Sequence, residues 1–263
     1  MPWRKASVLF CVLLILVGCS PVNNQPEAEL TSLEEWDVVV IGDSTLWGIG
    51  ENIAEHIESD YGISVNLHDF SIPNLTAAQA LEAVKNSEPD SPNAKMFGWP
   101  EIIQEAEYIV LHPSPAESIS KSNPGDWSCM YPPYYVENCS LDTFDKFQSD
   151  MREIVLEIQN LRGDQLVIIR FGSYWGRPGN WEADNAVENC QSCLETYSAA
   201  IEQVAEEFGI PFISFMDILN GPDHTLEPGD LGYIGIDKVH MSEEGMGLLA
   251  DEIWKLGITQ VQQ

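Results

Sequence analysis

A short run of β-branched residues near the beginning of the chain constrains the fold more than any other feature. The segment Trp36–Ile41 (WDVVVI) carries apolar side chains toward both faces, which is typical of a strand buried on both sides in a parallel sheet. Further strand-like runs alternate with helix-like segments as far as Gly257. The predicted strands are Trp36–Ile41, Ile63–Phe70, Tyr108–His112, Gln165–Phe171 and Ile210–Phe215, and the predicted helices are Ser44–Ser59, Thr76–Lys85, Glu101–Glu107, Leu141–Leu161, Leu194–Phe208 and Glu243–Leu256. Five strands alternating with helices predict an α/β protein with a doubly wound parallel sheet.

Two segments of this alternation are predicted as long loops. His112–Ser140 and Gly172–Cys193 exceed the ~12–15 residues beyond which an irregular connection usually has a function or is disordered. Both are rich in aromatic residues, which are Trp127, Tyr131, Tyr134, Tyr135, Tyr174, Trp175 and Trp181. One interpretation is that these rings contact a ligand above the sheet, by stacking on a sugar or lining an acyl pocket. The alternative is that they form a small satellite core beneath the loops.

The N-terminal residues have the pattern of an export signal. Arg4 and Lys5 precede the apolar run Ala6–Val17, which is shorter than the ~20 residues of a membrane-spanning helix. The run ends in Gly18-Cys19 and resembles a bacterial lipobox, which implies cleavage before Cys19 and its diacylation. An ordinary signal peptide with an incidental cysteine is the alternative.

This interpretation divides the chain into three parts and gives it a location. Residues 1–18 are the lipoprotein signal peptide, residues 19–34 a polar lipidated tether, and residues 35–263 the folded domain. We expect the domain to be anchored to the cell membrane on its extracytoplasmic face, either in the periplasm or at the cell surface.

Four cysteines remain in the predicted domain, namely Cys129, Cys139, Cys190 and Cys193. An even number of cysteines in an exported protein favours disulfides. The pairs 129–139 and 190–193 would each close one loop, and the crossed pairings stay open. A four-thiolate zinc site and a redox-active Cys-x-x-Cys are the alternatives, although neither the spacing nor the surrounding sequence favours them. We expect no metal.

The charge balance excludes several partners. The chain has 12 basic and 42 acidic residues and a formal net charge of −30. Binding nucleic acid requires cations that displace counterions from phosphates, and docking on anionic headgroups requires a basic patch. We therefore expect no nucleic-acid partner, and membrane attachment only through Cys19. Hydrophobic residues make up 44% of the chain, so it can bury a core.

Chemically useful residues follow the predicted strands, at the sheet edge where open α/β folds bind ligands. Ser44 follows the first strand, and Asp237 and His240 lie between the fifth strand and the last helix. Histidine is the natural base for a serine hydroxyl, and an aspartate three residues earlier can reach its Nδ1 atom. These residues form either a Ser-His-Asp triad or a helix N-cap and an unrelated surface pair.

Two blocks of sequence decide between these interpretations. Ile41–Gly48 (IGDSTLWG) resembles the first block of the SGNH/GDSL hydrolase superfamily, and Asp237–Gly245 (DKVHMSEEG) resembles its last block. The resemblance covers roughly Trp36 to Gly257. It implies a flavodoxin-like three-layer α/β/α sandwich with a five-stranded parallel sheet, and ester hydrolysis without metal or cofactor. It also implies Ser44 as nucleophile, His240 as general base and then acid, and Asp237 as its orienting partner.

The middle blocks differ from the family pattern. Where the family has a glycine whose N–H supports the oxyanion, this chain has Asn74, and where it has an asparagine donor, this chain has Ser114. The predicted oxyanion hole is therefore formed by Ser44, Asn74 and Ser114, with His112 or Arg170 as further candidates.

We thus expect a membrane-anchored extracytoplasmic serine esterase that forms an acyl-enzyme on Ser44. Its expected substrates are small-molecule or glycan esters. An O-acyltransferase with the same triad, and a non-catalytic binding lipoprotein on a decayed hydrolase scaffold, are the alternatives.

Overall fold

The computed structural model describes residues 35–114, 144–163, 168–172, 186–237 and 240–257, with only the backbone for residues 168–172 and 186–193. The predicted signal peptide, the tether with Cys19, the aromatic loop residues, and Cys129 and Cys139 lie outside the described residues. The same holds for the side chains of Arg170, Cys190 and Cys193, so the predicted disulfides stay predictions.

The strands form one parallel sheet. Its members are β1 (Glu35–Gly42), β2 (Ser64–Ser71), β3 (Tyr108–His112), β4 (Ile168–Gly172) and β5 (Phe212–Ile213). Their order is β2-β1-β3-β4-β5, which is the order of flavodoxin-like folds. The predicted α/β class and parallel sheet are confirmed.

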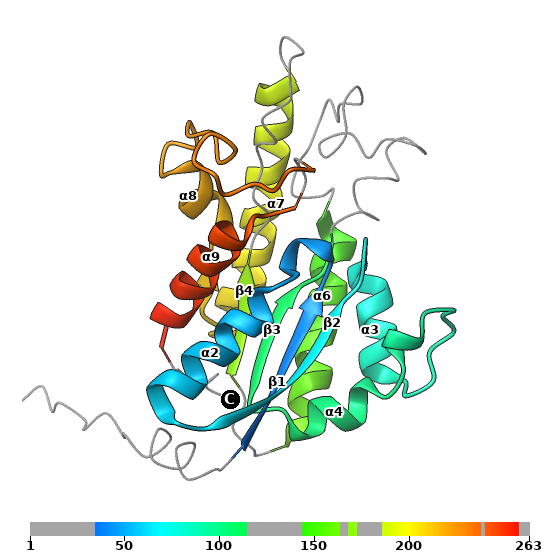
Figure 1. Cartoon of the computed structure of the whole chain (residues 1–263). Helices are drawn as coiled ribbons and strands as arrows, with labels where there is room; N and C mark the ends of the chain where they lie inside the picture. Colours follow the sequence, from blue (N-terminus) through cyan, green and yellow to red (C-terminus); the bar gives the residue numbers. More distant parts are fainter. Residues whose placement is uncertain (1–34, 115–143, 164–167, 173–185, 238–239, 258–263) are drawn as a thin grey trace, which may run out of the picture.

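Helices cover both faces of this sheet (Figure 1). They are α2 (Ile49–Tyr61), α3 (Ala77–Lys85), α4 (Trp99–Glu105), α6 (Asp145–Arg162), α7 (Ala186–Phe208), α8 (Phe215–Asn220) and α9 (Glu243–Lys255), with 3₁₀ turns η1 (Ser44–Leu46) and η2 (Ala94–Met96). In Figure 1, α2 and α9 lie on one face, and α3, α4 and α6 lie on the other. No helix within the described part of the chain has the length and apolar character needed to cross a membrane.

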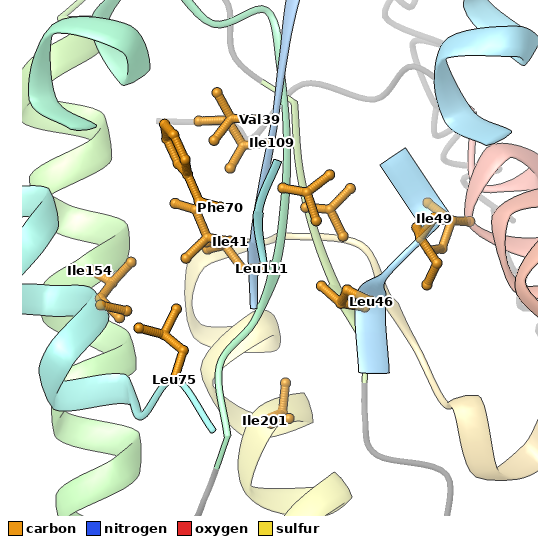
Figure 2. Close-up of a cluster of buried hydrophobic side chains, with 14 of the residues drawn as sticks. Val39, Ile41, Leu46, Ile49, Phe70, Leu75, Ile109, Leu111, Ile154 and Ile201 are labelled. Carbon is orange, nitrogen blue, oxygen red and sulfur yellow. The ribbon is translucent and has the colours of Figure 1, made fainter. Parts of the chain in front are cut away.

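Side-chain alternation along the strands builds the core on both faces. Phe70 of β2 stacks on Trp99 of α4, with ring centroids 4.7 Å apart. On the opposite face, Gly50 of α2 lies so close to β1 and β2 that an added Cβ would be 3.0 Å from Val40 Cγ2 and 2.8 Å from Leu67 Cδ1. Figure 2 shows this division, with Ile41 and Phe70 on the side of Ile154, and Leu46 and Ile49 on the other. β1 is therefore buried on both faces, as its composition predicts.

Three predicted elements differ from the structure. The helix predicted over Ser44–Ser59 is broken by Gly48, whose φ of 90° belongs to the left-handed region and separates η1 from α2. The strand predicted over Ile210–Phe215 is shorter, because Ser214 caps a helix that begins at Phe215. Helix α7 begins at Ala186, so residues 186–193 are helical and not part of a loop.

Candidate active site

The sheet register brings the ends of three strands together. Gly42, the last residue of β1, pairs with Ser71 at the end of β2 and with His112 at the end of β3. Ser44 and Ser114 follow two residues after their strands, and Asn74 follows three residues after its own. The three predicted oxyanion-hole residues therefore follow neighbouring strands at one edge of the sheet.

A tight turn after β1 holds Ser44. An added Cβ on Gly42 would lie 2.8 Å from the carbonyl oxygen of His112, so only glycine fits where β1 and β3 approach this closely. The buried carboxylate of Asp43 accepts hydrogen bonds from Thr45 N (2.9 Å) and Thr45 Oγ1 (2.6 Å). Asp43 is therefore the residue that caps η1, and Ser44 is the half-buried first residue of this turn and not its cap.

A second segment, Gly232–Ser242, carries Asp237 and His240 and is called the histidine arm below. Gly235 N donates to His240 O at 2.7 Å, and Ile234 forms an antiparallel bridge with Met241. Ser242 joins the arm to α9, because its N donates to Tyr233 O at 2.9 Å while its hydroxyl caps the helix at Gly245 N. The arm is thus tied both to itself and to the first turn of α9.

The arm places the three predicted catalytic side chains in contact. His240 Nε2 lies 2.9 Å from Ser44 Oγ, and His240 Nδ1 lies 2.6 Å from Asp237 Oδ2. The other carboxylate oxygen, Oδ1, accepts a hydrogen bond from His240 N at 3.0 Å. Ser44 and His240 are separated by 196 positions in the sequence, so their contact is produced by the fold.

The two partners of the His240 ring indicate which of its nitrogens carries the proton in the neutral form. Because Asp237 accepts a hydrogen bond at Nδ1, the neutral imidazole of His240 carries its proton there. Nε2 then presents a lone pair to the Ser44 hydroxyl, which donates to it. Such an arrangement can remove the serine proton as the oxygen attacks a carbonyl carbon.

The oxyanion-hole candidates lie in paired segments. Asn74 has a φ of 58°, in the left-handed region that glycine adopts most readily. Ser114 is buried, and its N donates to Leu75 O at 2.7 Å while the residue bridges Thr76. The Asn74 and Ser114 segments are therefore fixed to each other.

His112 is the other oxyanion-hole candidate from β3, and its environment differs from that of Ser114. The His112 side chain is buried, and its ring centroid is 5.5 Å from that of Phe215 in α8 and 6.3 Å from that of Tyr197 in α7. Its carbonyl oxygen serves the site indirectly by accepting the N–H of Asp43 at 3.3 Å.

Trp47 is a site residue that the sequence reasoning did not single out. Its indole stacks on the imidazole of His240, with ring centroids 5.0 Å apart and an angle of 17° between the rings. The signal available in the sequence was its position three residues after Ser44, which puts both residues on the same short turn.

The comparisons with known proteins give the fold. No protein-family model matches the chain, and no curated protein matches its sequence. Among solved structures, a lipase from a goat rumen metagenome is 14% identical, with a TM-score of 0.62, covering 86% of this chain and all of the lipase. An acetylxylan esterase from Geobacillus stearothermophilus is 16% identical, with a TM-score of 0.55, and the match covers 87% of this chain and 97% of the esterase chain.

A third solved structure, of the protein TesA, is 13% identical with a TM-score of 0.50, and the match covers 83% of this chain and 96% of the TesA chain. The matches extend over nearly the whole length of each neighbour, so the similarity concerns complete folds. The chain therefore has the fold that these three solved structures share, in agreement with the fold implied by its resemblance to the SGNH/GDSL hydrolases.

Proposed function

We propose that this chain is a serine ester hydrolase of the SGNH/GDSL type, with Ser44, His240 and Asp237 as its triad. The observation that carries the proposal is the continuous hydrogen-bonded chain from Ser44 Oγ through His240 to Asp237 Oδ2. The neighbours named as a lipase and an acetylxylan esterase support the same reaction class.

In the proposed mechanism, Ser44 Oγ attacks the ester carbonyl carbon while His240 Nε2 takes the hydroxyl proton. The imidazolium then gives this proton to the leaving alkoxide as the carbon–oxygen bond breaks, which leaves an acyl group on Ser44. A water molecule attacks the acyl-enzyme, His240 takes one of its protons, and the acid is released as the proton returns to Ser44. Asp237 holds the imidazole and stabilises its charged form.

The oxyanion of each tetrahedral intermediate needs donors. We assign this role to the N–H groups of Ser44 and Asn74 and to the hydroxyl of Ser114. The left-handed backbone of Asn74 and the pairing of Ser114 with the Leu75–Thr76 segment support the assignment. A hydroxyl in place of the family's asparagine keeps a donor at that position.

The substrates we propose are esters of small molecules or of glycans, since one neighbour is named as an acetylxylan esterase. We further propose that Cys19 carries lipid and anchors the enzyme to the membrane, on the basis of the lipobox-like sequence before it. Replacement of Cys19 by serine is expected to move the enzyme from the membrane fraction to the soluble fraction of the expressing cells.

The activity is tested with a short p-nitrophenyl ester. We expect Ser44→Ala to lower kcat/KM by about 10³-fold or more, because a triad acts as a unit. Ser59→Ala is the matched control, since it removes the same hydroxyl from the exposed surface of α2. Equal turnover by wild type and Ser44→Ala would remove the assignment, and an inert wild type would favour the non-catalytic alternative. A glycan acceptor added to the assay separates hydrolysis from acyl transfer by its products.

A further inference from the structure

We propose that Trp47 is a positioning residue for this triad, whose indole face holds the imidazole of His240 between Ser44 and Asp237 and stabilises the charged ring during turnover. The inference rests on the proposed function and adds to it a residue outside the triad. It starts from the stack between Trp47 and His240, in which the two rings are nearly parallel.

His240 needs such support because its surroundings are open to water. The side chain of His240 is 29% exposed and that of Asp237 is 49% exposed. Water competes for the hydrogen bonds of an exposed pair, which makes such a pair a weak constraint on the ring. An aromatic ring on one face of the imidazole covers that face and opposes rotation of the ring out of the Ser44–Asp237 line.

Trp47 is itself fixed to the parts that position Ser44. Its backbone N–H donates to Ser44 O at 3.4 Å, which closes η1, and its indole Nε1–H donates to Ser71 O at 3.4 Å at the end of β2. The nucleophile and the stacking ring are therefore on one turn, and this turn is tied to the neighbouring strand.

The chemistry of the stack favours the state that forms during the reaction. When His240 takes the serine proton it becomes a cation, and a cation over an indole face is attracted by the ring quadrupole. The neutral imidazole gains less from the same contact. The stack is therefore stronger in the transition state than in the resting enzyme, which is the condition for raising kcat.

The same molecule contains a second histidine that is stacked on a tryptophan and paired with an aspartate. Trp254 stacks on His56, with ring centroids 5.6 Å apart, and His56 Nε2 lies 2.8 Å from Asp251 Oδ1. The His56 side chain is also 29% exposed. Trp254 lies near the end of α9, whereas the histidine arm joins the beginning of that helix. Trp254→Leu is thus the control for loss of a tryptophan that covers a histidine.

The experiment compares Trp47→Leu, Trp47→Phe and Trp254→Leu in the full chain with a p-nitrophenyl ester. We expect Trp47→Leu to lower kcat about fivefold to thirtyfold, as expected for loss of a cation–π contact, with KM within about twofold. Trp47→Phe should retain most of the wild-type kcat, because an aromatic ring remains beside His240. Trp254→Leu should have the kcat of the wild type.

A second readout does not depend on turnover. We expect the Nδ1–H proton that His240 donates to Asp237 to give a downfield NMR resonance, identified by its absence in His240→Gln. We expect it to broaden or disappear in Trp47→Leu and to persist in Trp254→Leu. An unchanged kcat and resonance in Trp47→Leu overturn the inference, as does a rise in KM alone, which would make Trp47 a substrate contact. An inert wild type that still loses the resonance on Trp47→Leu would refute the proposed function and leave the positioning role standing.

Discussion

Gly245 tests whether the first turn of α9 sets the position of the histidine arm. A Cβ added to this glycine would lie 2.3 Å from the carbonyl oxygen of Tyr233, whereas Cβ contacts below 3.0 Å essentially do not occur. The atom in the way belongs to the backbone, and the same carbonyl accepts the N–H of Ser242 at 2.9 Å. Gly245→Ala therefore forces the arm and the helix apart by about 0.7 Å at least, the difference between these two separations.

A displacement of this size matters because the arm carries His240. The 2.9 Å contact between His240 Nε2 and Ser44 Oγ has only a few tenths of an ångström to spare before the hydrogen bond weakens. A catalytic group misplaced by about 1 Å can lower the rate about 10²-fold. We expect a loss of kcat of this order for Gly245→Ala, and a loss of about 1–3 kcal/mol in the free energy of unfolding from the added bulk.

The assay measures kcat on a p-nitrophenyl ester and the unfolding free energy in urea. Gly247→Ala is the matched control, since it lies two positions further in the same helix and its added Cβ would have Asn52 Oδ1 at 3.6 Å, an ordinary contact. We expect this control to keep its kcat and to gain about 0.5–1 kcal/mol from the alanine in the helix. Wild-type kcat and stability in Gly245→Ala would refute the argument that this close approach fixes the arm.

Three further predictions concern other parts of the site and its surroundings. Asp237→Asn should lower kcat about 10³- to 10⁴-fold with little change in stability, because the amide no longer holds the required tautomer of His240. Asn74→Gly should keep activity and stability, whereas Asn74→Ala should lose about 1 kcal/mol in urea unfolding, because its backbone is left-handed. Burial of His224 disfavours its charged form, but its ring hydrogen bonds to Asp217 and Glu195 outweigh this and raise its pKa. The resulting stabilisation is complete below the unfolded pKa of about 6.5 and is lost as pH rises through the folded pKa. In His224→Gln, the free energy of unfolding measured in urea should therefore decrease less between about pH 6.5 and higher pH than it does in the wild type.

The sequence was sufficient for those parts of the fold that depend on local pattern. The apolar run of β1 predicted a strand buried on both faces, and Asp237 and His240 are close enough in sequence for one short segment to join them. The contact of His240 with Ser44 was implied by the resemblance of the two sequence blocks to the SGNH/GDSL hydrolases, because His240 lies far beyond the end of β5.

The details that the sequence did not predict depend on contacts between segments. The histidine arm is held by the bridge of Ile234 to Met241 and by backbone hydrogen bonds, and neither has a periodic signature. Glycine also occurs within helices, so the sequence alone does not predict a break at Gly48. The break results from the left-handed backbone of this residue. The stack of Trp47 on His240 joins residues far apart in the sequence, so the position of Trp47 three residues after Ser44 hints at its place in the site but does not by itself predict the stack.

Covalent labelling of Ser44 is the most direct test of the central claim that this hydroxyl is activated by His240. The full chain is treated with a fluorophosphonate probe, and the peptide that contains Ser44 is analysed by mass spectrometry. We predict one adduct on Ser44 in the wild type, at least about 10²-fold slower labelling in His240→Ala, and none on this peptide in Ser44→Ala. A wild-type protein that stays unlabelled at Ser44, or that is labelled equally fast without His240, would contradict the account.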